Sequence, residues 1–77
     1  MPDAVTNATK LTVRVFLENA QSGEARRILK ALLATRCKVA QVKGAMEKMR
    51  AALPVDPLIQ TDINHLERLL QAMQVKV

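Results

Sequence analysis

Residues 24–53 read EARRILKALLATRCKVAQVKGAMEKMRAAL, and apolar residues recur in them at alternating steps of three and four. This spacing is typical of a helix that packs against a second helix. The positions in this seam are Ala25, Ile28, Leu32, Thr35, Val39, Val42, Met46, Met49 and Leu53. Pro54 and Pro57 end the run, because proline has no amide hydrogen and disfavours helical geometry in the residue before it. The stretch therefore predicts one long helix over 24–53.

A second apolar run follows at once, over residues 58–77, and predicts a second helix. Its members are Ile59, Ile63, Leu66, Leu70, Met73 and Val77. A short connection makes consecutive helices antiparallel neighbours. One register pairs Leu53 with Ile59, Met49 with Ile63, Met46 with Leu66, Val42 with Leu70, Val39 with Met73 and Thr35 with Val77. The two runs together predict an antiparallel helical hairpin.

The region before the hairpin is less regular. Residues 1–9, MPDAVTNAT, show no clear period and are interpreted as a flexible arm, which leaves 10–77 as a single small domain. Residues 10–17, KLTVRVFL, alternate apolar and polar positions, which favours a strand, while a short helix also fits so few residues. Ser22 or Asn19 can cap the helix that follows. The predicted fold class is mainly α, with the 10–17 segment packed on the open end of the hairpin or swapped across it.

The composition points away from catalysis. The 77 residues include one cysteine, one histidine and one aromatic side chain, Phe16, and they match no catalytic or cofactor motif. Cys37 lies beside Arg36 and Lys38, which favour a thiolate, but no general base is near it in sequence. His65 is interpreted as a solvated side chain, since one histidine cannot build a site alone. We expect a cytoplasmic protein that is not an enzyme, with no cofactor, metal, membrane segment or small-molecule substrate.

The register leaves one end of the first helix without a partner. Beyond Thr35 the apolar residues continue backwards through Leu33, Leu32, Leu29, Ile28 and Ala25. Leaving several aliphatic side chains in water would forfeit several kcal/mol, at roughly 25 cal/mol per Å². Within the chain they can be covered by Leu11, Val13 and Val15; otherwise another protein or a second copy must cover them. This predicts a small protein–protein interaction module, acting as an adaptor, co-chaperone or regulator.

The charge distribution supports an alternative function. The net charge is +5, and residues 24–53 carry eight basic residues against Glu24 and Glu47. A basic helix face can contact nucleic-acid phosphates without reading sequence. The candidate contacts are Arg26, Arg27, Lys30, Arg36, Lys43 and Arg50. Ala40 and Gly44 resemble the alanine-then-glycine spacing of a helix-turn-helix, although Lys43 and Arg50 stand where that motif has apolar residues. The alternative is a DNA-binding transcriptional regulator.

Overall fold

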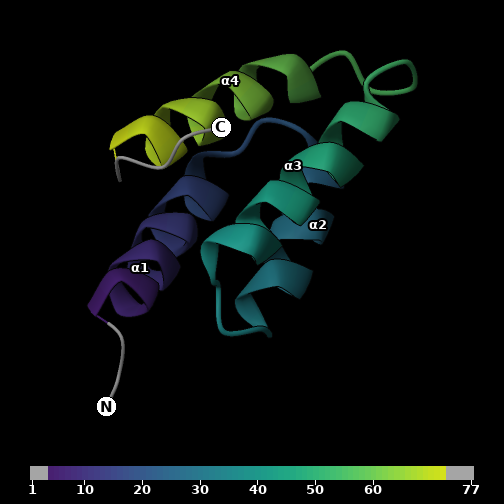
Figure 1. Ribbon diagram of the computed structural model, residues 1–77. Helices are drawn as coiled ribbons and strands as arrows, with labels where there is room; N and C mark the ends of the chain where they lie inside the picture. Colours follow the sequence, from purple (N-terminus) through teal and green to yellow (C-terminus); the bar gives the residue numbers. More distant parts are fainter. Residues whose placement is uncertain (1–3, 73–77) are drawn as a thin grey trace.

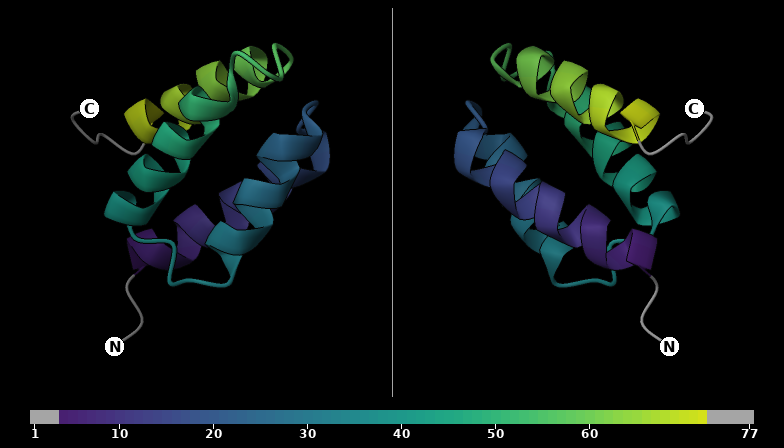
Figure 2. Two further views of the ribbon diagram at one scale, coloured as in Figure 1. Left: turned by 90° about the vertical axis from the view of Figure 1, so that its right-hand side faces the viewer. Right: turned by 90° about the vertical axis from the view of Figure 1, so that its left-hand side faces the viewer.

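The computed structural model describes residues 4–72, with side chains from Asn7 onward, and this part of the chain contains four helices and no strand (Figure 1). The helices are α1 (Ala4–Asn19), α2 (Gly23–Leu33), α3 (Val39–Ala52) and α4 (Ile59–Ala72). Each helix contacts the next in the chain, and α2 also contacts α4. Successive helices reverse direction, as the two views of Figure 2 show. The protein is therefore all-helical over the described residues, as the composition favours.

The strand predicted over 10–17 is wrong, because these residues lie inside α1. The buried positions Thr9 and Val13 and the half-buried Phe16 and Leu17 repeat with helical spacing. A strand would place Leu11, Val13 and Val15 on one face, whereas Val13 is 0% exposed, Leu11 63% and Val15 55%. α1 also takes up residues 4–9 of the predicted arm, and residues 1–3 lie outside the described part. The eight residues 10–17 are compatible with both the two-residue period of a strand and the period of a helix. Over its full length, α1 fits only the helical period.

The single helix predicted over 24–53 is also wrong, because it is interrupted at residues 34–38. Thr35 donates its hydroxyl hydrogen to the Leu32 carbonyl and accepts the backbone N–H of Cys37 at 3.1 Å. Such local side-chain bonds compete with helix continuation. Cys37 then adopts a φ of 54°, in the left-handed region, which redirects the chain. The backbone N–H of Lys38 donates to the side-chain oxygen of Gln41 at 2.8 Å. Lys38 is the N-cap residue of α3, which begins at Val39.

This interruption changes what covers the apolar start of the predicted helix. α2 folds back against α3, and Ala25, Ile28, Leu29 and Leu32 are 0–5% exposed within the chain's own core. Leu33 is half-buried and packs against the same core. Of the two alternatives left open by the sequence, the structure therefore shows cover from within the chain, with Val13 of α1 in the same core and Leu11 and Val15 exposed. Because the helix ends at Leu33 and the chain reverses, its apolar stripe packs against α1 and α3.

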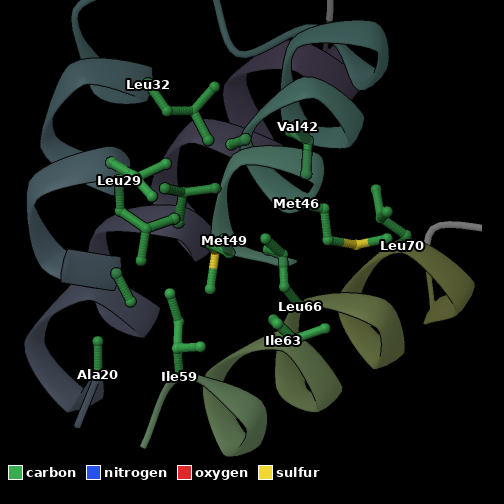
Figure 3. Packing of buried hydrophobic residues seen from close by; sticks show 14 of the residues in the cluster. Ala20, Leu29, Leu32, Val42, Met46, Met49, Ile59, Ile63, Leu66 and Leu70 are labelled. Carbon is green, nitrogen blue, oxygen red and sulfur yellow. The ribbon is translucent and has the colours of Figure 1, made fainter. Parts of the chain in front are cut away.

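The seam residues of the second half are buried in the described region (Figure 3). They are Val42, Met46 and Met49 on α3 and Ile59, Ile63, Leu66 and Leu70 on α4. Met46 points toward Leu70 in the close view, and α3 contacts α4. The layer-by-layer register stays a prediction, and its Val39–Met73 and Thr35–Val77 layers involve residues outside the described part. These seven side chains on two connected helices are seven of the fifteen buried apolar residues in the described region.

Candidate interaction site

An open groove of about 230 Å³ lies between α2 and α3, and we call it the α2–α3 groove. Its lining residues are Ile28, Ala31 and Leu32 from α2, Thr35 from the α2–α3 connection, and Gln41, Gly44, Ala45 and Lys48 from α3. Most of these side chains are aliphatic or small, and the polar ones come from the α2–α3 connection and from α3. The site is thus an apolar depression between two antiparallel helices, with polar groups along it.

Small residues leave this space open. Ala31, Gly44 and Ala45 contribute at most one methyl group each to its walls. A Cβ atom built on Gly44 would meet no heavy atom within 4 Å outside its own helical backbone. Gly44 lies in the interior of a continuous α3, so it does not form the turn that a helix-turn-helix would require at this point. The groove therefore results from the residue types that face each other across α2 and α3.

A buried carboxylate fixes where α2 begins, and hence the position of one groove wall. Asp62 on α4 is 1% exposed, and its oxygens accept the backbone N–H groups of Gln21 at 3.0 Å and Ser22 at 2.9 Å. The hydroxyl of Ser22 accepts the N–H of Ala25 at 3.2 Å, which confirms the predicted cap, and donates to the carboxylate of Asp56. The linker between α1 and α2 is thereby held by α4 and by the loop that precedes it.

Cys37 fixes the other end of the same wall. A continuous helix over 24–53 would put Cys37 on an exposed helix face, but the residue is 0% exposed in the α2–α3 connection. Its thiol donates to the carbonyl oxygen of Leu32 at a sulfur–oxygen distance of 3.4 Å. The side chain acts as a small buried hydrophobic group that anchors the turn.

Several side chains predicted to contact nucleic acid form ion pairs or hydrogen bonds within the protein. Arg50 pairs with Glu47 at 3.2 Å and with Glu67, which joins α3 to α4. Arg27 pairs with Glu24 one turn earlier; this hydrogen bond lowers the pKa of the Glu24 carboxyl and raises the pKa of the Arg27 guanidinium.

The other four candidates are not in these ion pairs. Arg26 donates to the backbone carbonyl of Ala20 at 2.8 Å. Lys30 and Arg36 are exposed, and Lys43 is half-buried. The six side chains therefore do not form one uniform phosphate-facing surface, because Arg26, Arg27 and Arg50 among them bind groups within the chain.

The predicted partner-binding residues separate into three groups. Ile28 and Leu32 line the α2–α3 groove at its floor. Leu11 and Val15 are exposed on the outer face of α1. The remaining residues, Ala25, Leu29, Val13 and Leu33, pack in or against the core.

Sequence reasoning missed most of the groove, namely Ala31, Thr35, Gln41, Gly44, Ala45 and Lys48 as a set. It also missed Asp62. This acidic residue shares a helix face with the apolar Ile59 and Leu66, which was a usable signal for a buried polar contact. His65 is exposed, as predicted, and its ring meets the edge of Phe16 with centroids 5.9 Å apart.

Within residues 4–72 no group of three or more histidine, cysteine or acidic side chains is placed to hold a metal ion. No helix in the same part of the chain has the length and apolar character needed to cross a membrane. Comparison with protein-family models, with curated proteins and with solved structures gives no match to this chain.

Proposed function

We propose that this protein is a small protein–protein interaction module that docks a segment of a partner protein in the α2–α3 groove. The observation that carries the proposal is the apolar floor of the groove, formed by Ile28, Leu32 and Ala45 on two helices that the core holds in place. Apolar grooves between helices receive apolar side chains of partner segments. An adaptor, co-chaperone or regulator uses such a surface.

The chemistry of the groove supports binding. Of the described residues that line it, Lys48 carries the charge, and Thr35 and Gln41 supply neutral polar groups. Side chains of this kind orient a bound segment through hydrogen bonds and one charge contact. Acid–base catalysis uses titratable groups placed within hydrogen-bond reach of a reacting atom, and one lysine on an open apolar surface is better suited to recognition.

The experiment selects peptides from a phage-displayed library against the purified protein. Gly44→Leu extends a side chain into the groove from a position where an added Cβ atom meets nothing within 4 Å, so we expect the fold to tolerate it. Gly23→Ala is the matched control, because Gly23 is an exposed glycine with equally open surroundings at the start of α2. We expect peptides that bind the parent protein and Gly23→Ala and lose binding to Gly44→Leu. Selection that yields no such groove-dependent peptide would overturn the docking function.

The DNA-binding alternative is tested on the same preparations. Fluorescence anisotropy with duplex DNA at low and moderate salt measures the electrostatic attraction that a phosphate-binding face produces. Lys30→Gln combined with Arg36→Gln removes two exposed cations that have no part in the core. We expect weak binding that this pair of changes barely alters. Tight, salt-dependent binding lost in the double variant would favour a nucleic-acid partner over a protein partner.

A further inference from the structure

Gly44 has no explanation within its own chain. It occupies the interior of α3, where glycine is about 1 kcal/mol less favourable than alanine. Its backbone is outside the left-handed region, so no turn requires it. A Cβ atom at this position would have open space, so no close neighbour within the chain requires it either. A residue that destabilises the free helix and meets nothing in the fold is explained by something outside the fold.

The position of Gly44 indicates what that is. Gly44 faces the α2–α3 groove between two alanines, Ala31 across the groove and Ala45 beside it. Glycine allows another backbone to approach a helix closely. Helices pack with their axes 8–10 Å apart depending on the side chains at the contact, and the smallest residues permit the closest crossings. The geometry therefore favours a helical occupant that crosses α3 at Gly44.

The charge around the groove selects the chemistry of that occupant. Lys48 lines the groove one helical turn after Gly44, and residues 24–53 carry eight basic residues against two acidic ones. Lys30, Arg36 and Lys38 are exposed in the same segment. A second copy that docked through this same face would bring like charge to it, which is unfavourable, whereas an acidic segment is attracted and oriented by it.

We propose that the partner segment is an acidic amphipathic helix that crosses α3 at Gly44 and places a carboxylate beside Lys48. This inference rests on the proposed docking function and names the chemistry of the partner. The apolar face of the helix covers Ile28 and Leu32, and a small residue lies over Gly44. Its acidic flank faces the positive surface of α2 and α3.

The test uses the sequences of the groove-dependent peptides. We expect them to carry apolar residues at helical spacing, an excess of Asp and Glu along one flank, and a small residue among the apolar positions. A synthetic copy of one such peptide should gain helical circular dichroism on binding. Groove-dependent peptides that are neutral or basic would overturn the acidic-helix inference and leave the docking function standing. An absence of groove-dependent peptides would instead remove the docking function itself.

Two variants locate the contact. Lys48→Glu should weaken binding of the acidic peptide about fivefold or more, and changing the facing peptide Glu to Lys should restore it, since rescue requires the two charges to meet. Gly44→Ala should weaken binding while Gly23→Ala does not. Binding unchanged in both Lys48→Glu and Gly44→Ala would overturn the crossing geometry. Light scattering that shows a dimer, converted to a monomer by Gly44→Leu, would put a second copy in the groove and overturn the acidic partner.

Discussion

The carboxylate of Asp62 on α4 accepts the backbone N–H of Ser22, forty residues earlier in the chain, at 2.9 Å. The same carboxylate accepts the N–H of Gln21 at 3.0 Å, and Asp62 is 1% exposed. Hydrogen bonds that a carboxylate accepts are stronger than those between neutral groups. If the carboxylate were removed, the buried N–H groups would have no water molecule to accept their hydrogen bonds. Asp62 thus links the last described helix to the linker at which α2 begins.

We expect Asp62→Ala to reduce the free energy of unfolding by about 2–4 kcal/mol, because it leaves two backbone N–H groups without their acceptor. Urea unfolding followed by circular dichroism measures the change. Glu18→Ala is the control, since Glu18 is an exposed acidic residue on α1 and should change stability by less than about 0.5 kcal/mol. Equal effects for the two variants would contradict the role assigned to Asp62.

A pair of valines distinguishes the helical α1 from a strand. Val13 is 0% exposed and Val15 is 55% exposed. We expect Val13→Ala to destabilise the protein by about 1.5–3 kcal/mol through lost burial, and Val15→Ala to be neutral or slightly stabilising through higher helix propensity. Denaturant unfolding of the two variants measures both. Similar losses at both positions would indicate the alternating arrangement of a strand.

Leu66 tests the packing of α3 against α4. It is 0% exposed, and Leu66→Ala should destabilise the protein by about 2–5 kcal/mol, the range for a buried leucine whose removal leaves a cavity. Leu58→Ala is the control, because Leu58 is 57% exposed just before α4 and its truncation should cost less than about 0.5 kcal/mol. A thermal or urea melt gives both values. A small loss at Leu66 would mean that α4 does not pack as described.

Gly44→Ala should make the free protein more stable by about 0.5–1 kcal/mol. The added methyl group meets open space, and alanine is the better helix former. The measurement is the urea midpoint at unchanged slope, which isolates a change in stability. A destabilised variant would show that the groove is closed in solution.

Cys37 should react slowly with a thiol reagent in the folded protein and rapidly after unfolding in urea. Its sulfur is buried and bound to the Leu32 carbonyl, so the reagent reaches it only when the structure opens. Absorbance of the released thiolate follows the reaction, with a free-cysteine peptide as the reference for full reactivity. Equal rates in the folded and unfolded states would place Cys37 on an exposed surface.

Several features followed from the sequence because they depend on local periodicity. The spacing of Val42, Met46 and Met49 and of Ile59, Ile63 and Leu66 predicted two helices, and all six side chains are buried. Prolines at 54 and 57 predicted the connection between them. Hydrophobic spacing over several turns determines which stripe of a helix is buried, whatever the stripe then meets.

The interruption at residues 34–38 could not be found in the same way. Apolar residues keep three-and-four spacing across it, from Ile28 and Leu32 to Val39 and Val42, because α2 and α3 both face the same core. The hydrophobic spacing therefore continues across residues 34–38, although the helix ends there. Thr35 and Cys37 make the break through side-chain bonds and a left-handed residue, which no hydrophobic pattern records.

The sequence by itself determined that this protein is mainly helical and which residues of its second half form apolar stripes. It also determined that the excess of positive charge lies in residues 24–53. The tertiary structure decided that the start of α2 is covered within the chain, and that Ala31, Gly44 and Lys48 line one open groove. Periodicity is a property of neighbours along the chain, whereas a groove is a property of two helices whose reversal brings small residues together.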